Sequence, residues 1–421
     1  MTDLETRKRI IALIRQEVVP AIGCTEPMAV ALCTAKATEQ LGCRPERIEA
    51  RLSANILKNA MGVGIPGTGM IGLPIAIALG ALVGKSEYQL EVLKDLTPEA
   101  LEAGKQYIAE KRIDIGLKEG ECDKLYIEIV VTAGAKTSKA IIAGGHTTFV
   151  SEGNAVKTVS ENSDEIALNM RLVYDFATTA PLDEIRFIEE TRTYNMNAAR
   201  EAIKGNYGHN LGKTIDRPMA KGIFGNSIFS HIISRTAAAC DARMGGSMIP
   251  VMSNSGSGNQ GICATNPVCV FAKENENTEE ELIRALMLSH LTAIYIKQSL
   301  GKLSALCGCV VASIGSSCGI TYLMGGDYER ICYSVKNMIA NLTGMICDGA
   351  KPSCSLKITS GVSTAVLSAL LAIEGKCVTS EEGIVDDCVD KSIHNLTAIG
   401  ADGMGITDEM VLNIMTSKKN A

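Results

Sequence analysis

The strongest constraint on the fold is a stretch without any charged side chain, residues 303–324. A stretch of this length must avoid water, either in a bilayer, where about 20 apolar residues suffice to span, or inside a protein. Serines and glycines within the stretch dilute its hydropathy, and no flank rich in Lys or Arg supports insertion. We therefore expect a buried central helix and no membrane association.

The composition supports a large core and a small ligand. The 421 residues are 46% hydrophobic, which is enough for a core spanning two or three domains. Trp is absent and there are 40 glycines, so helices are expected to pack closely through small residues. A net charge of −6 argues against a nucleic-acid partner. A neutral or zwitterionic small molecule fits better.

The cysteines indicate the compartment. The chain has 15 of them, and its first residues form a charged helical pattern without the features of a signal peptide. Such usage is typical of a reducing cytoplasm, where thiols stay free or bind metal. We expect a cytoplasmic protein, and we allow for a homodimer.

The apolar periodicity predicts a predominantly helical α+β protein. Alternating or β-rich patterns occur at 48–57, 125–131 and 138–143, whereas helical patterns dominate from residue 182 onward. Thr278 and Glu281 form a capping-box signature for a helix ending near Leu300. We predict a helical cluster-binding core from residues 1–45 plus 180–421, and a smaller α/β region from 46–179. The polar stretch 157–165 is the best boundary.

Two cysteines lie at expected helix ends. An apolar segment stops at Cys347 and continues into Asp-Gly and Lys-Pro turn signals, while Cys24 directly precedes a helix opening at Thr25. A thiolate at a helix N-terminus is favoured by the free N–H groups. No CxxC pattern is present, so spacing alone leaves Cys347 as a ligand, a nucleophile or a small buried residue. Three dispersed thiolates would still suit an iron–sulfur cluster with one open iron.

Two glycine-rich loops could bind a ligand. Residues 252–261 combine hydroxyls, amides and glycines, which suits a carboxylate or the polar head of an amino acid, although a solvated linker has the same composition. Residues 61–69 could turn N–H groups toward an anion or serve as a structural hinge.

The candidate bases are few. His146 follows two glycines that let a ring project from a strand end, and Lys58 and Lys351 lie near candidate loops. Each could act as a base if burial lowered its pKa, but local hydrogen bonding or surface pairing is the alternative for all three.

Six motifs resemble those of the L-cysteine desulfidase family, also called UPF0597, whose C-terminal part is similar to the alpha domain of iron–sulfur L-serine dehydratases. The resemblance covers nearly the whole chain. It is carried by Gly23-Cys24-Thr25-Glu26-Pro27, Lys58-Asn59, Gly144-Gly145-His146-Thr147, Ser255-Gly256-Ser257-Gly258-Asn259-Gln260-Gly261, Ser304-Ala305-Leu306-Cys307-Gly308-Cys309 and Gly344-Met345-Ile346-Cys347-Asp348-Gly349-Ala350-Lys351.

The resemblance implies a [4Fe–4S] cluster held by Cys24, Cys307 and Cys347, with Cys309 and Cys354 as alternatives for the second and third ligands. It implies cleavage of L-cysteine to pyruvate, ammonia and hydrogen sulfide, without pyridoxal phosphate. The substrate carboxylate would be held by a loop and one asparagine, namely Ser255, Gly256, Ser257, Asn259 and Asn59. The base would be Lys58, His146 or Lys351. The alternatives are deamination of L-serine by the same cluster, a non-catalytic zinc or iron–sulfur protein, and a membrane-associated transport component.

Overall fold

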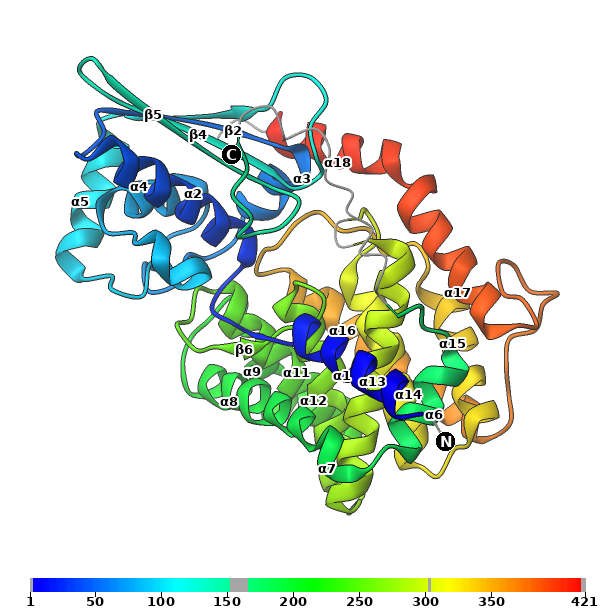
Figure 1. Ribbon diagram of the computed structural model, residues 1–421. Helices are drawn as coiled ribbons and strands as arrows, with labels where there is room; N and C mark the ends of the chain where they lie inside the picture. The colour runs from blue at the N-terminus through cyan, green and yellow to red at the C-terminus, as the bar shows by residue number, and fades with distance from the viewer. Residues whose placement is uncertain (1–2, 152–165, 302–303, 418–421) are drawn as a thin grey trace.

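The computed structural model describes residues 3–151, 166–301 and 304–417, and the expected boundary at 157–165 lies outside the described residues. It shows a mostly helical α+β protein, as predicted, with a small sheet region beside a larger helical body (Figure 1). The helices are α1 (Leu4–Glu17), α2 (Thr25–Leu41), α3 (Ala54–Ala60), α4 (Leu73–Leu82), η1 (Ser86–Glu91), α5 (Pro98–Ala109), α6 (Met170–Thr179), α7 (Leu182–Ile185), η2 (Arg186–Glu189), α8 (Glu190–Lys204), α9 (Leu211–Ile215), α10 (Pro218–Phe224), α11 (Ile228–Met244), α12 (Gly258–Glu274), α13 (Glu279–Leu300), α14 (Gly308–Leu323), α15 (Tyr328–Leu342), α16 (Cys354–Ile373), α17 (Val389–Ala398), η3 (Ile399–Gly403) and α18 (Gly405–Thr416).

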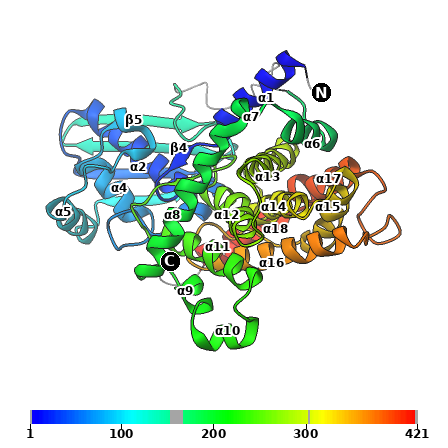
Figure 2. The same cartoon turned by 90° about the horizontal axis from the view of Figure 1, so that it is seen from below.

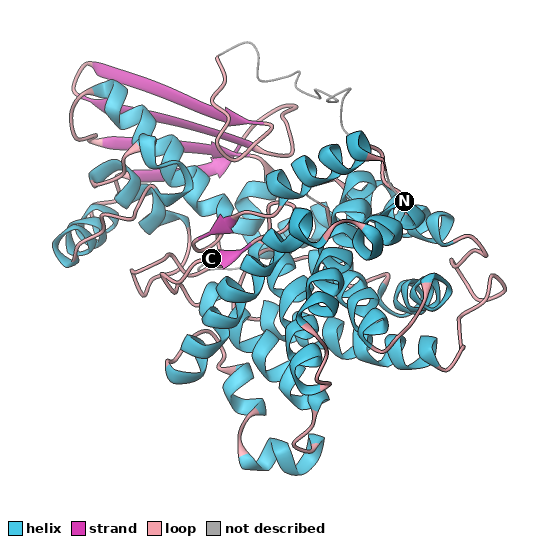
Figure 3. Ribbon diagram, turned by 60° about the horizontal axis from the view of Figure 1, so that its bottom comes forward, coloured by secondary structure: helices cyan, strands magenta, loops and turns pink. Residues whose placement is uncertain are grey.

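The main sheet has the strand order β3-β2-β4-β5. Its strands are β2 (Arg47–Leu52), β3 (Ile113–Leu117), β4 (Tyr126–Ala133) and β5 (Lys136–Ala143). The hairpin of β4 and β5 turns at Gly134, whose positive φ of 55° suits a tight turn, and this confirms the predicted pair of strands. Strand β2 pairs antiparallel with β4 and parallel with β3, which the sequence did not indicate. Helices α2, α4 and α5 cover one face of the sheet (Figures 1 and 3).

The uncharged stretch becomes α14, which lies in the middle of the helical body between α12, α13, α15 and α16 (Figure 2). Every residue of α14 except Gly308 and Tyr322 is buried. The interpretation as a buried central helix is therefore confirmed. Its close packing uses small residues, since a Cβ on Gly315 would lie 2.2 Å from the Ser289 carbonyl oxygen of α13.

Helix α2 packs against α4, β4 and β5, so residues 28–41 share the apolar core of the sheet. Residues 166–180 instead contribute to the core of the helical body. This packing differs from the expected division at residues 45 and 179. We propose to group α2 with the α/β region and α6 with the helical body. A two-stranded ribbon of β1 (Pro20–Ala21) and β6 (Val251–Met252) joins the start of the chain to that body.

Helix α16 is the one helix in the described ranges that is long and apolar enough to cross a membrane by length and composition. A core helix meets the same criteria, and α16 packs against α11, α14 and α15. Its outer face carries the exposed side chains of Leu356, Leu367, Leu370 and Leu371.

The structure describes a single chain, so the expected homodimer stays a prediction.

Candidate metal centre and substrate pocket

Four helices begin around one cavity between the helical body and the α/β region. The residues that line it include Thr25 at the start of α2, Ser257 before α12, Gly308 of α14 and Cys354 of α16. The first N–H groups of each helix lack intrahelical acceptors and carry partial positive charge. The cavity is therefore favourable for negatively charged groups, including thiolates.

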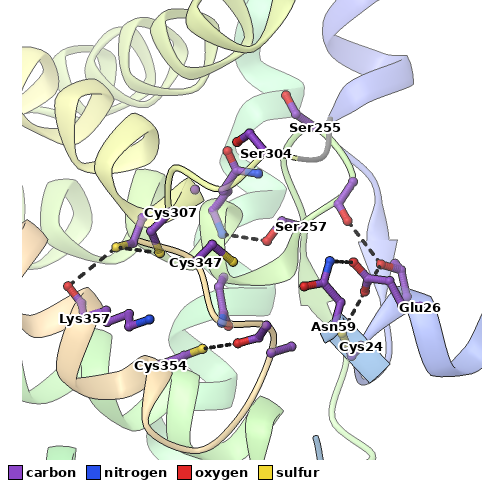
Figure 4. Close-up of a pocket in the computed structure, with 18 of the residues that line it drawn as sticks. Cys24, Glu26, Asn59, Ser255, Ser257, Ser304, Cys307, Cys347, Cys354 and Lys357 are labelled. Carbon is purple, nitrogen blue, oxygen red and sulfur yellow. Dashed lines mark hydrogen bonds between the residues drawn. The ribbon is translucent and has the colours of Figure 1, made fainter. Parts of the chain in front are cut away.

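Cys24, Cys307 and Cys347 come from three distant parts of the chain and line this cavity together (Figure 4). Local backbone pairing places two of them side by side. The Cys307 N–H donates to the Met345 carbonyl at 2.9 Å, and the Cys347 N–H donates to the Ala305 carbonyl at 2.6 Å. Cys24 is the N-cap of α2, where its side chain makes no capping bond. The structure thus brings the three predicted ligands to one place.

The three thiols are held in their neutral form by their surroundings. Burial and the nearby Glu26 raise the pKa of Cys24. A hydrogen bond with Cys309, together with burial, raises the pKa of Cys307, and a hydrogen bond with Cys307 and burial raise that of Cys347. Binding of a cation removes such protons because metal ligation requires the thiolate.

The donor set fits an iron–sulfur cluster better than a single ion. Among the described residues, no three His, Cys, Asp or Glu side chains are grouped closely enough to hold one metal ion. Three thiols spread around one cavity suit a cluster whose separate irons each take one thiolate. Cys309 and Cys354 also line the cavity, with the sulfurs of Cys309 and Cys307 3.3 Å apart, so the alternative ligands remain available.

Glu26 is the one carboxylate among the described residues that line the cavity. It is buried and accepts hydrogen bonds from the Cys24 thiol at 2.9 Å, the Thr25 hydroxyl at 3.0 Å and the Asn59 amide at 3.1 Å. Burial disfavours its charge, but His146, the hydrogen bonds and the nearby Arg243 lower its pKa overall. Glu26 therefore supplies a negative charge beside the predicted ligand Cys24.

The expected ligand-binding loop, residues 252–261, lies on the cavity with Ser255, Gly256, Ser257 and Asn259 in the lining. From Gly258 onward it is the first turn of α12 and not a loop, and we call the whole segment 252–261 the serine-glycine loop. Its buried position excludes the solvated-linker interpretation. A network behind the loop holds it, because Asn254 donates to both the Nδ1 atom and the carbonyl oxygen of His290 at 3.1 Å. Figure 4 shows Ser255 and Ser257 on the side of the cavity that faces Glu26 and Asn59.

Of the three candidate bases, only His146 lines the cavity. Lys58 is buried in an ion pair with Asp408 of α18, beside a different pocket. Lys351 donates to the carbonyl oxygen of Asp348 three residues earlier. Lys58 and Lys351 are therefore not among the residues that line the cavity, although Lys58 lies close enough to Cys347 for its positive charge to oppose the rise in the pKa of that thiol.

The glycine loop 61–69 has a packing role at Gly64, where a Cβ would lie 2.7 Å from the backbone nitrogen of Gly246.

The sequence alone did not single out four further lining residues: Arg243, Gln260, Lys297 and Lys357. Gln260 lies inside the recognised motif of residues 255–261 but was not chosen as a substrate contact. Lys357 pairs with Asp348, directly after Cys347. Arg243 and Lys297 lie inside α11 and α13, where no local pattern marks them.

Comparison with known proteins identifies the family of the chain. Residues 87–413 match the family model described as the serine dehydratase alpha chain, a class of iron–sulfur dehydratases. Proteins named UPF0597 protein from Bacteroides thetaiotaomicron, Phocaeicola vulgatus and Oleidesulfovibrio alaskensis are 67%, 68% and 47% identical, each match covering 98% of both chains.

By its fold, its cysteines and this match, the chain belongs to the serine dehydratase alpha-chain class. Within that class it belongs to the UPF0597 family, which confirms the family recognised from the motifs. A lyase-type reaction assisted by an iron–sulfur cluster is the activity that this class suggests.

Proposed function

We propose that the protein is a [4Fe–4S]-dependent L-cysteine desulfidase. One observation carries the proposal: the same cavity is lined by three thiols and by polar side chains of both positive and negative charge. The thiols Cys24, Cys307 and Cys347 would hold the cluster. Glu26, Asn59 and the serine-glycine loop would match the charged groups of a small amino acid.

The bound cluster would supply an open iron that acts as a Lewis acid on the leaving sulfur. The residues of the chain would bind and orient the substrate. Glu26 and Asn59 would accept the α-ammonium group, since the Oδ1 atom of Asn59 is buried without a hydrogen-bond partner. The loop from Ser255 to Asn259 would orient the Cα–H bond toward a base.

His146 would be that base, because it is the one candidate of the three that lines the cavity. It would take the α-proton while the Cβ–S bond breaks and the electron pair leaves with sulfur as sulfide. The resulting 2-aminoacrylate tautomerises to an imine, and water hydrolyses the imine to pyruvate and ammonia. Fifteen free cysteines support a reducing, cytoplasmic location.

L-serine deamination is the second candidate, and the match to the serine dehydratase alpha chain favours it. In that reaction hydroxide leaves in place of sulfide, and the remaining steps are the same. The desulfidase-like motifs and the preference of sulfur for soft metal centres favour cysteine.

Anaerobic purification tests the proposal. We expect brown protein with about four irons and four sulfides per chain, and release of pyruvate and sulfide from L-cysteine faster than release of pyruvate from L-serine. Cys347→Ala should lose iron, whereas Cys43→Ala, at an exposed thiol away from the cavity, should keep it. Colourless protein that contains zinc would contradict the cluster. Faster turnover of L-serine than of L-cysteine would show that L-serine is the preferred substrate.

A further inference from the structure

Arg243 is a buried cation whose donors have no hydrogen-bond partner among the described residues, although its charge lies close enough to Glu26 to lower the pKa of that carboxyl. Its exposed fraction is 3%, and it lines the cavity from the end of α11. In the described part of the chain its guanidinium makes no hydrogen bond or salt bridge, and its Nε atom is fully buried. A guanidinium has five N–H donors and stays charged, so burying it with none of these donors hydrogen-bonded is costly.

The neighbouring backbone makes room for this side chain. A Cβ on Gly258 would lie 2.3 Å from the Nε atom of Arg243 and 2.8 Å from its Cδ atom. Only glycine therefore fits at this position in the serine-glycine loop while Arg243 keeps its place. Arg243 therefore packs directly against the serine-glycine loop, whose hydroxyl and amide groups line the same cavity.

The other two cations on the cavity are already engaged. Lys357 is paired with Asp348 and also donates to the Ile346 carbonyl at 2.9 Å. Lys297 has interactions of its own. Arg243 is thus the cation whose donors are left for a ligand.

The groups around Arg243 indicate which ligand. Glu26 and the unpartnered Oδ1 atom of Asn59 provide negative charge and an acceptor for an ammonium group. A guanidinium provides two parallel donors that match a carboxylate. Opposite charges lining one small cavity suit an α-amino acid, whose ammonium and carboxylate groups are attached to the same carbon.

We propose that Arg243 binds the α-carboxylate of the amino-acid substrate, an inference that rests on the proposed function. The serine-glycine loop then orients the bound carboxylate, and Arg243 supplies its counter-charge. Arg243 selects for a free carboxylate, so an amide or a decarboxylated analogue of the substrate binds poorly.

Binding of unreactive analogues to the cluster-loaded protein tests this directly. L-Alanine keeps both charged groups but has no leaving group, and L-alaninamide lacks the carboxylate charge. By anaerobic calorimetry we expect the wild type to bind L-alanine at least about 10-fold more tightly than L-alaninamide. Equal affinity for the two would overturn the proposal without any variant.

Arg243→Gln should bind L-alanine roughly 100-fold more weakly and lose most of the preference over L-alaninamide. Arg243→Lys, which keeps the charge but not the two parallel donors, should fall between. Arg200→Gln, at an exposed arginine of α8, is the matched control and should bind like the wild type. Both Arg243 variants should keep the iron content and absorption spectrum of the wild type.

Two results would reject the role of Arg243: unchanged L-alanine affinity in both Arg243 variants, or loss of iron from both, which would assign the arginine to the cluster. These results are distinct from failure of the proposed function. A wild type that binds L-alanine through Arg243 but releases no pyruvate would contradict the activity and retain the carboxylate site.

Discussion

His290 holds the serine-glycine loop through Asn254 and is fully buried in α13. Its Nδ1 atom accepts from Asn254, so its Nε2 atom carries the proton and donates to the Thr265 hydroxyl at 3.0 Å. Burial lowers its pKa from 6.5 to about 3. At a pH between about 3 and 6.5, His290 therefore binds a proton in the unfolded chain but not in the folded protein. The stability contributed by neutral His290 is therefore present above about pH 6.5 and is lost as the pH falls toward 3.

At pH 5 this linkage should lower the free energy of unfolding by roughly 2 kcal/mol relative to neutral pH. His290→Gln cannot take up the proton, so its loss of stability between pH 7.5 and 5 should be smaller by that amount. Denaturant unfolding of cluster-free protein at both pH values measures the difference. His394→Gln, at an exposed histidine of α17, should keep the acid sensitivity of the wild type. Equal acid sensitivity in His290→Gln would contradict the assignment.

Short motifs predicted part of the candidate site. Cys24, Cys307 and Cys347 could be chosen because each lies in a recognisable motif, and the cavity contains all three. Lys58 could not be assigned in the same way, since its partner Asp408 is 350 residues away. Arg243 was missed because an arginine within a helix has no local signature of burial. Burial and pairing depend on the assembled fold, which a motif does not report.

The packing of α14 against α13 positions Cys307, because that cysteine is the N-cap of α14. The two helices approach so closely at Gly315 that a Cβ would lie 2.2 Å from a backbone oxygen of α13. A backbone atom cannot rotate away as a side chain can. Gly315→Ala should therefore destabilise the protein by about 1–3 kcal/mol, although alanine favours a helix intrinsically.

Gly222 in α10 provides the matched control. It is exposed, and a Cβ there would meet no atom within 4 Å. Gly222→Ala should leave the free energy of unfolding unchanged or raise it by up to about 1 kcal/mol. Thermal and denaturant unfolding of both variants compare the sites. Similar effects of the two substitutions would show that the contact between α13 and α14 adapts more easily than the distance indicates.

Elements with strong local signals were predicted well. The capping box of Thr278 and Glu281 begins α13, which ends at Leu300 as expected. The strand expected over 48–57 ends at Leu52, because Ser53 caps α3 and its hydroxyl accepts from the Ile56 N–H. Strand β3 was missed, since it is short and only half buried at the edge of the sheet. Where the apolar pattern was weak, as in β3, pairing with a distant strand determined the secondary structure.

At the scale of the whole molecule, α18 connects the two parts of the structure. Met404 at its start belongs to the core of the helical body, while Leu412 belongs to the core of the sheet region. Between them, Asp408 pairs with Lys58 of α3, whose side chain is almost fully buried. In Figure 1 this last helix runs from the helical body to α3 and the sheet. The pair therefore stabilises the relative position of the two sides of the cavity.

Removing the acidic partner should leave the Lys58 ammonium buried without a counter-charge. Asp408→Asn should lower the free energy of unfolding by about 2–3 kcal/mol, less than for a fully buried pair because Asp408 is 22% exposed. Glu409→Gln, an exposed neighbour on the same helix, should have little effect. Adding Lys58→Met to Asp408→Asn should recover much of the loss, since no buried charge remains.

The same variants separate a structural role of Lys58 from a catalytic one. If the lysine only connects α3 to α18, then the folded double variant should retain cluster content and turn over L-cysteine at a rate near that of the wild type. A catalytic base is required for turnover even when the variant is stably folded. Loss of turnover with full iron content would therefore indicate that Lys58 takes part in the reaction. Denaturant unfolding, iron content and pyruvate release, measured on the same preparations, distinguish these outcomes. Retained turnover would leave His146 as the one candidate base on the cavity.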